Sequence, residues 1–223
     1  MTLSIAAWDE TSGQLGAAIA SSSISVAARC LHWRPGIGVA LSQNITDPRL
    51  GPRLLALLAD GVSVADALAA VGRSTPHIAY RQLVVVDSTG NTGLFTGDQA
   101  LGRFAAAEGR HCAAAGNLLA DAAVPGAMTA AFENAAGSLG TRLLAALCAG
   151  ADAGGEAGPL HSAGLLVGGE PGWPLAELRI DWSDDPLDAL RTGWAVYEPQ
   201  IDDYVTRAYD PTRAPSYGVP GDP

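Results

Sequence analysis

The second residue of the chain is a hydroxyl amino acid at the head of a strand-like run. Thr2 follows Met1 directly and opens the apolar segment 3–7. Thr2 is small enough for the preceding methionine to be removed after synthesis. A chain that starts at Thr2 carries a hydroxyl nucleophile and a free α-amine on one residue. Because an α-amine titrates near about 7.7–8.0, it can accept the hydroxyl proton without a histidine.

A second hydroxyl, that of Ser4, competes with Thr2 for the role of nucleophile. The two side chains lie two residues apart on one expected strand, so they point to the same face. Thr2 needs only the removal of Met1, whereas the amine of Ser4 could be freed only by cleavage after Leu3. Both alternatives stay open, and so does a third in which neither acts and Ser4 hydrogen-bonds within the sheet.

An amide hydrolase also needs hydrogen-bond donors for the negative charge that develops on the substrate oxygen. Gln43 and Asn44 close an expected strand just before a helix, where backbone N–H groups can converge. Asn117 leaves the end of another strand and carries a neutral amide donor. We expect Gln43 and Asn117 to stabilise the oxyanion, with ordinary turn hydrogen bonding as the alternative.

Further polar residues could contact a substrate near the same strand ends. Ser21 and Ser22 end the strand that should pair with the first one, so either could reach the N-terminal amine. Arg81 could bind a substrate carboxylate, although a surface role is more frequent for an arginine. The residues expected to bind substrate are Ser21, Ser22, Asn44, Arg81 and His161. A dyad between His161 and Ser162 is not expected, because neighbouring strand residues face opposite sides.

The composition excludes several classes of protein. The net charge of −10, with no cluster of basic residues, argues against binding to nucleic acid. The four histidines show no metal-ligand spacing, and there is no phosphate loop or dinucleotide motif, so no metal or cofactor is expected. The three cysteines have no redox or metal spacing and should be reduced. With no signal segment and no apolar run near about 18 residues, we expect a soluble cytoplasmic protein away from membranes.

The expected elements come in blocks of strands and paired helices. Two apolar runs flank a hairpin turn and are continuous, which is typical of strands covered on both faces. The expected strands are 3–8, 14–20, 36–42, 83–86, 92–95, 112–115, 162–167 and 175–180, and the expected helices are 50–60, 63–71, 123–135, 138–150 and 185–197. Residues 151–159, small and glycine-rich, should form a mobile loop. Residues 1–208 are expected to be one domain, followed by a proline-rich arm, 209–223.

The order βββ, αα, βββ, αα, ββ, α differs from the alternation of a doubly wound sheet. Helices in adjacent pairs fit two stacked sheets, each covered on its outer side by a helix pair. Ser63, Ser138 and Asp185 should cap helices, and Pro186 suits a first helical turn. The pattern therefore predicts an α+β fold of four layers, an αββα sandwich.

Ordered motifs along about residues 2–197 resemble one bacterial family. They include Ser4-Ile5-Ala6, Gly36-Ile37-Gly38-Val39-Ala40, Arg81-Gln82, Phe95-Thr96-Gly97, Gly116-Asn117, Gly154-Gly155, Ser162-Ala163 and Leu178-Arg179-Ile180-Asp181. The family is called domain of unknown function 1028, and it is similar to the N-terminal-nucleophile (Ntn) hydrolases. The resemblance implies the four-layer αββα fold and, by analogy of fold alone, amide hydrolysis.

The chain departs from that family pattern at positions that usually carry positive charge. Ser22 stands where the family has an arginine, and the segment 156–161 replaces a basic run. Either the substrate is more neutral or the site has lost its activity. Our hypothesis is a hydrolase of a small-molecule C–N bond, in an amide or ureide, that acts through Thr2. The alternative is a catalytically silent αββα protein that binds a small metabolite or serves in an assembly.

We also expect a homodimer or a larger homo-oligomer. Only 16% of the residues are charged, against a typical value of about 25%. The proline-rich arm has no obvious place within a single domain, and its tyrosine and proline faces could be buried in a symmetric contact.

Overall fold

Two antiparallel sheets form the centre of the fold. The computed structural model describes residues 2–219, so the expected removal of Met1 and the arm residues Pro220 and Pro223 lie outside the described residues. The first sheet has the strand order β10 (Pro174–Ile180), β9 (Ser162–Gly168), β2 (Leu15–Ser21), β1 (Thr2–Trp8), β8 (Cys112–Asn117), β7 (Ala105–Gly109). The second has the order β3 (Leu31–Arg34), β4 (Gly38–Asn44), β5 (Arg81–Asp87), β6 (Thr92–Thr96).

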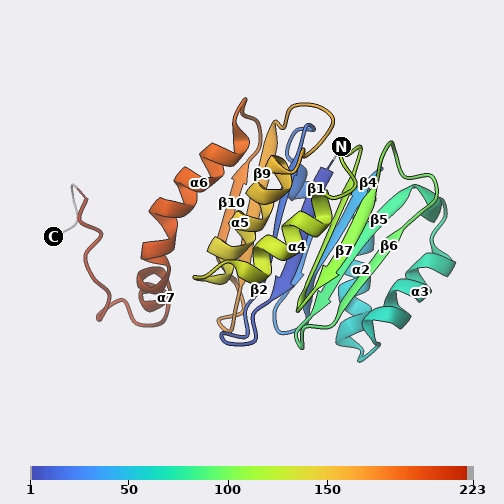
Figure 1. Cartoon of the computed structure of the whole chain (residues 1–223). Helices are drawn as coiled ribbons and strands as arrows, with labels where there is room; N and C mark the ends of the chain where they lie inside the picture. Colours follow the sequence, from blue (N-terminus) through green and yellow to red (C-terminus); the bar gives the residue numbers. More distant parts are fainter. Residues whose placement is uncertain (1, 220–223) are drawn as a thin grey trace.

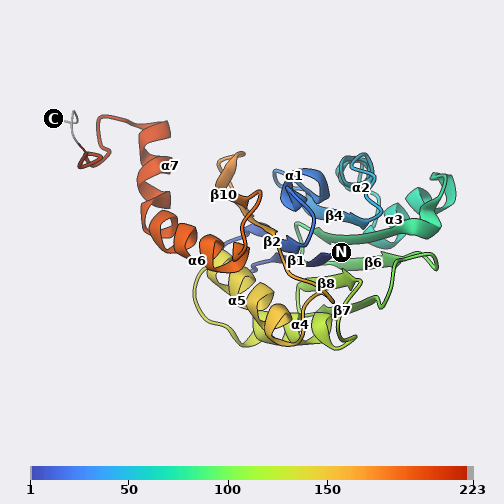
Figure 2. The same cartoon turned by 90° about the horizontal axis from the view of Figure 1, so that it is seen from above.

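Helices cover the outer faces of the two sheets (Figures 1 and 2). The helices α4 (Val124–Asn134), α5 (Leu139–Asp152) and α6 (Pro186–Tyr197) pack on the first sheet, and α2 (Leu50–Ala59) and α3 (Val64–Ser74) pack on the second. The short helix α1 (Val26–Cys30) closes one edge between the sheets, and α7 (Ile201–Tyr209) follows α6. Short 3-10 turns occupy Ile78–Tyr80 and Glu198–Gln200.

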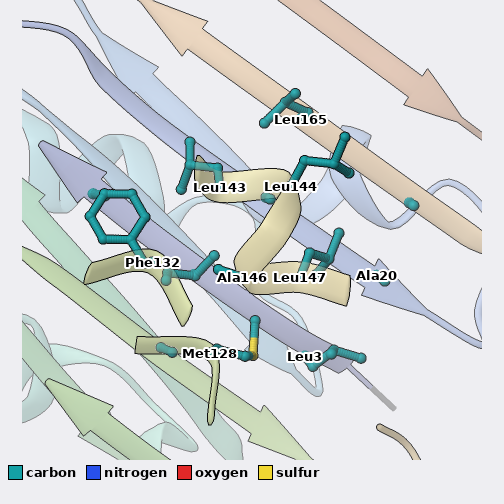
Figure 3. Packing of buried hydrophobic residues seen from close by; sticks show 14 of the residues in the cluster. Leu3, Ala20, Met128, Phe132, Leu143, Leu144, Ala146, Leu147 and Leu165 are labelled. Carbon is teal, nitrogen blue, oxygen red and sulfur yellow. The ribbon is translucent and has the colours of Figure 1, made fainter. Parts of the chain in front are cut away.

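The buried side chains form three hydrophobic clusters, one on each outer face and one between the sheets. Figure 3 shows the largest, where Met128 of α4 and Leu147 of α5 lie beside Leu3 of β1. Between the sheets the residues are smaller, for example Ala6 and Ile19 facing Leu41 and Val84. Helices α2 and α3 bury Leu54, Leu68 and Val71 against the second sheet.

The alternation along β1 decides which way its hydroxyl residues point. Leu3, Ile5 and Ala7 belong to the cluster under the helices, whereas Ala6 belongs to the cluster between the sheets. Because side chains alternate along a strand, Thr2 and Ser4 share the side of Ala6. Both hydroxyl residues therefore face the second sheet.

Most expected elements are present, and their helix caps are confirmed. Ser63, Ser138 and Asp185 each accept a hydrogen bond from the backbone N–H three residues later. Strands β1 and β2 are buried almost throughout, as their continuous apolar sequences predicted. Three cysteines are free: Cys30, Cys112 and Cys148.

Some elements were not expected from the sequence. These are α1, β3, β7 and α7. The strand expected over residues 36–42 is β4, which begins at Gly38 rather than Gly36. The segment 151–159 was expected to be a mobile loop, yet α5 continues to Asp152 and backbone hydrogen bonds anchor the rest. Gly155 accepts from Ala120 N at 3.1 Å, and Ala157 N donates to Leu118 at 2.9 Å. The expected start of the arm, residue 209, falls on the last residue of α7.

The contact between α5 and α6 depends on the absence of a side chain at Gly140. A Cβ atom there would lie 2.3 Å from the ring of Trp194, whereas a Cβ at Gly126 on α4 would meet nothing within 4 Å. Gly140→Ala should therefore destabilise the protein by about 1–3 kcal/mol, because α6 must shift. Gly126→Ala should instead be stabilising by about 0.4–1 kcal/mol, because alanine favours a helix. Urea unfolding of both variants checks this, and equal midpoints would contradict it.

Candidate functional site

Thr2 lies where three strands of the first sheet end side by side. It pairs with Asn117 at the end of β8, and the pairing of Leu3 with Ala20 places Ser21, the last residue of β2, on its other flank. Thr2 is 4% exposed, and both Asn117 and Ser21 are fully buried. The expected nucleophile and two expected partners are therefore neighbours.

A chain of buried hydrogen bonds joins the two sheets below Thr2. Ser4 Oγ donates to Gln43 Oε1 at 2.7 Å, and Gln43 Nε2 donates to Gln82 Oε1 at 2.8 Å. Asn117 Nδ2 donates to the same Gln82 oxygen at 3.2 Å. On its other side Gln82 Nε2 donates to Thr96 Oγ1 and to a backbone carbonyl of β8, each at 3.1 Å. Gln82 is therefore the centre of the network.

The two expected oxyanion donors, Gln43 and Asn117, differ in how many of their side-chain amide groups are already used in hydrogen bonds. Gln43 Nε2 uses both of its hydrogens, one for Gln82 and one for the carbonyl of Ala115 at 3.2 Å. Asn117 Nδ2 donates to Gln82 alone among the described residues, and its Oδ1 is a buried acceptor with no hydrogen-bond partner among them. The side chain of Asn117 thus keeps one donor and one acceptor for other groups beside Thr2, whereas the side chain of Gln43 supports the network.

A buried carboxylate closes this end of the first sheet. Glu156 is 5% exposed, and its two oxygens accept from the backbone N–H of Ser22 at 3.1 and 3.2 Å. Burial raises the pKa of Glu156 to about 7, opposed by the positive charge at the start of the chain and by hydrogen bonds from Ser22 and Ser21. Ser22, expected to bind substrate, contacts this carboxylate through its backbone.

The serines that follow β2 form a hydrogen-bonded loop. Ser21 Oγ lies 2.9 Å from Ser23 Oγ, and Ser162 Oγ donates to the carbonyl of Ser23 at 2.5 Å. His161 N donates to the carbonyl of Ser21 at 2.9 Å, and its ring stacks on Trp182 at 4.4 Å. Ser162 and His161 are thus engaged separately, in line with the prediction that they form no dyad.

Asn44 and Arg81 hold the loops at the matching end of the second sheet. Asn44 Nδ2 donates to the carbonyl of Tyr80 at 2.6 Å, and its Oδ1 accepts from Leu101 N at 3.1 Å. Arg81 donates to the carbonyl of Ile45. Both residues lie at this end of the sheets, where they order the loops around the site.

Exposed apolar side chains surround the same end of the sheets. They lie in the loops after β2 and β4, in the segments before β5 and β7, and beside His161. The set is Ile24, Ile45, Tyr80, Leu101, Phe104 and Trp182. The nearby arginines bind backbone carbonyls: Arg29 that of Ile24, Arg81 that of Ile45 and Arg103 that of Ala120. The exposed side chains around this end of the sheets are therefore largely apolar, and the three arginines named donate to backbone carbonyls.

A cavity of about 410 Å³ lies at the opposite end of β1, beyond Trp8. Its charges are paired within the protein: Arg142 with Asp9 at 3.1 Å, and Arg110 with Glu10 at 2.7 Å. Glu133, which also lines the cavity, accepts from the backbone N–H of Arg110 at 2.6 Å, so the charged side chains of this cavity are engaged within the protein. The chemistry we consider lies at the Thr2 end.

Two residues of the site were missed in the sequence, Gln82 and Glu156. Gln82 is a polar residue at the start of the apolar run 83–86, and an amide in that position was a usable signal. Glu156 is the single acid between two glycines and a proline in segment 154–159, and nothing local marks it as buried. Within residues 2–219 no group of three or more His, Cys, Asp or Glu side chains could hold a metal ion. No helix in that range is long and apolar enough to cross a membrane.

The position of Gln82 at the centre of the network predicts a large cost for its loss. Gln82→Met should destabilise the protein by about 2–4 kcal/mol, because amide donors of Gln43 and Asn117 lose their acceptor while buried. Thr96→Val removes one acceptor at the edge of the network and should cost only about 1 kcal/mol. Denaturant unfolding of both variants measures the difference, and equal losses would contradict the central role of Gln82.

Two comparisons with known proteins identify the family to which this chain belongs. A family model described as "Family of unknown function (DUF1028)" matches residues 2–190. A crystal structure from Silicibacter pomeroyi that carries the same family model is 34% identical, covers 89% of this chain and 88% of its own, and superposes with a TM-score of 0.82.

More distant structures match with low scores. Anbu (ancestral beta-subunit) from Yersinia bercovieri is 14% identical with a TM-score of 0.39, covering 92% of this chain and 97% of its own. Anbu from Hyphomicrobium sp. strain MC1 has the same identity and TM-score and covers 98% of this chain and 100% of its own. These two matches are too distant to carry functional inference. A search of curated proteins found no match. The family model and the Silicibacter pomeroyi structure together show that the chain belongs to the DUF1028 family.

Proposed function

We propose that this protein hydrolyses a C–N bond in a small amide or ureide, with Thr2 as an N-terminal nucleophile. The observation that carries the proposal is the position of Thr2 at the end of the central strand, facing the second sheet between Asn117 and Ser21. Two facing antiparallel sheets with helices on their outer sides are what the αββα fold of Ntn hydrolases requires, and we assign that fold here.

In the proposed reaction Thr2 Oγ attacks the substrate carbonyl carbon while its proton passes to the α-amine of Thr2. The amine then gives that proton to the leaving nitrogen, the C–N bond breaks, and an ester to Thr2 remains. A water molecule attacks the ester, the amine takes one of its protons, and the proton returns to Thr2 Oγ as the acid leaves. The chain contains thirteen arginines and no lysine, so no lysine amine can act as the base in place of the α-amine.

The free N–H of Asn117 would stabilise the oxyanion, since it belongs to the residue paired with Thr2. The side chain of Gln43 would hold that geometry rather than donate, because both of its amide hydrogens are used. Ser4 is the weaker candidate for nucleophile, because it is fully buried and its hydroxyl donates to Gln43.

The surroundings of the site favour a neutral and partly apolar substrate. Apolar side chains line the mouth, and Arg29, Arg81 and Arg103 are all tied to backbone carbonyls. These bonds to carbonyls occupy guanidinium donors that a strongly anionic substrate would need, although Arg81 Nε is a buried donor with no partner among the described residues. We therefore place Ser21 and His161 at the edge of the substrate pocket, with Asn44 and Arg81 ordering its loops.

Substitution of Thr2 tests the proposal. Thr2→Ala should lower turnover of a panel of aliphatic N-acyl p-nitroanilides and cyclic ureides by at least about 10³-fold, since a nucleophile and its base act as a unit. It should also abolish labelling of the N-terminal peptide by a β-lactone probe, read by mass spectrometry. Ser4→Ala should retain the labelling at a lower stability, because Gln43 Oε1 loses its donor.

Three results would count against Thr2. They are retention of Met1 on most molecules by intact mass, near-native turnover of Thr2→Ala, and activity that depends on Ser4. A wild-type protein that begins at Thr2 but shows neither turnover nor labelling would favour the catalytically silent alternative.

We also propose that the chain forms a homodimer or a larger homo-oligomer. Helix α7 has no buried residue, and it extends with the segment after it away from the sheets (Figures 1 and 2). Exposed tyrosines lie along this part: Tyr204, Tyr209 and Tyr217, of which Tyr209 is 62% exposed. A partner copy would bury these rings.

Light scattering at micromolar concentration should give a multiple of the chain mass of 22.7 kDa. Truncation after Arg207 should weaken the assembly, because it removes Tyr209 and Tyr217. The mass of a single chain for the full-length protein would contradict the proposal, and an unchanged oligomer after truncation would move the interface to another surface.

A further inference from the structure

The segment that carries Glu156 is attached to both strands that flank β1. On one side, its backbone bonds to the residues after β8: Ala120 N donates to Gly155 O, and Ala157 N donates to Leu118 O. On the other side, the Glu156 carboxylate accepts from Ser22 N, directly after β2. Since β1 lies between β8 and β2 in the sheet, Glu156 must cross in front of the first residue of β1.

We propose that Glu156 is a positioning residue whose carboxylate binds the α-amine of Thr2 and holds it next to the Thr2 hydroxyl. This inference rests on the proposed function, because Thr2 has a free amine only after removal of Met1. The contact itself is independent of catalysis and can be measured without a substrate.

A buried carboxylate needs more than the donor that Ser22 provides. The backbone N–H of Ser22 reaches both of its oxygens, and the side chains of Ser22 and Ser21 add neutral donors, but a buried carboxylate without a charged partner is costly. An ammonium at the start of β1 would supply the missing charge. Asn117 Oδ1, which has no partner among the described residues, is a second acceptor at the same strand end. The two acceptors would orient the amine from both flanks of β1.

The other charged or titratable groups around Glu156 are committed elsewhere. Two are arginines: Arg29 donates to Ser23 and Ile24, and Arg103 donates to Ala120. The other two are Asp121, which accepts from Ala123 N, and His161, whose ring stacks on Trp182. None of these hydrogen bonds or stacking contacts involves the Glu156 carboxylate. The α-amine is thus the cation that best matches it.

The charge of Glu156 also suits an amine that must release its proton. Burial raises the pKa of this carboxyl to about 7, close to the ordinary value of about 7.7–8.0 for an α-amine. A carboxylate beside the amine favours the ammonium form, so it raises the pKa of the amine. Because burial raises the pKa of the Glu156 carboxyl, this carboxylate can accept the ammonium proton and leave a neutral amine for Thr2.

The absence of lysine makes the test selective, because the α-amine is the chain's one primary amine. The chain 2–223, released from a ubiquitin fusion so that it starts at Thr2, is labelled with trace acetic anhydride across a pH series. Mass spectrometry of the N-terminal peptide then gives the pKa of the amine, since only the neutral form reacts. Glu156→Gln keeps an acceptor for Ser22 N but removes the charge. It should lower the pKa of the amine by about one unit or more.

Asp152→Asn is the matched control, because Asp152 is an exposed carboxylate four residues earlier in the same region. This variant should leave the pKa of the amine within about 0.2 unit of wild type. An unchanged amine in Glu156→Gln, or an equal shift in Asp152→Asn, would overturn the proposal. Retention of Met1 in cells would instead contradict the nucleophile and leave this contact standing.

The pH dependence of turnover separates positioning from mere structural support. If Glu156 holds the amine, Glu156→Gln should move the acidic limb of the kcat/KM profile to lower pH by the same amount as the pKa of the amine. A purely structural residue would lower turnover and leave the limb in place. If the rate of Glu156→Gln falls while the acidic limb of its kcat/KM profile stays in place, the assignment of Glu156 as a positioning residue is contradicted.

Discussion

The hydrogen bond between the side-chain amides of Gln43 and Gln82 is the contact on which the arrangement of this protein depends. It is 2.8 Å long, is fully buried, and joins the neighbouring strands β4 and β5 of the second sheet on the side that faces the first sheet. Around it the inter-sheet core consists largely of small side chains such as Ala6 and Ala115, which specify little by shape. If β4 or β5 shifted by one residue in its pairing, the amide side chain of Gln43 or Gln82 would point to the other face of the sheet. It would then lie in the helix-covered core without hydrogen-bond partners. Because the two amides also bond to Ser4 and Asn117 of the first sheet, the network favours a single alignment of the sheets.

That alignment places the chemistry at the end of β1. Asn117 bonds to Gln82 and pairs with Thr2, so the network that couples the sheets also sets the position of the Asn117 amide beside Thr2, the proposed nucleophile. Ser4 lies two residues further along β1 on the same face, and its hydroxyl donates the first hydrogen bond of the network. Two hydroxyls that look equivalent along the sequence thus differ in role: one is part of the support, and the other stands at the open end of the strand.

Charge is distributed around this site in an unusual way for a protein with a net charge of −10. Arg29 and Arg81 bind backbone carbonyls, and the buried carboxylate of Glu156 accepts from a backbone N–H. These three side chains hold the loops at this end of the sheets, among exposed apolar side chains.

The elements that the sequence alone determined are those with local signals. Ser63, Ser138 and Asp185 cap helices through donors three residues away, and the buried runs of β1 and β2 are continuous in the sequence. The position of Thr2 at the head of β1 also followed from the sequence. Short-range hydrogen bonding and hydrophobic periodicity are enough for these features, because both partners lie within a few residues.

Only the tertiary structure decided the elements and site residues whose partners are distant. The alanine-rich β7 is a strand because it adds to the edge of β8, and α7 is a helix without a buried face. Gln82 becomes central through Gln43, and Glu156 becomes a site residue through Ser22, 134 positions away. A buried polar group is identified by what satisfies it, and here the satisfying groups arrive from other strands when the two sheets close.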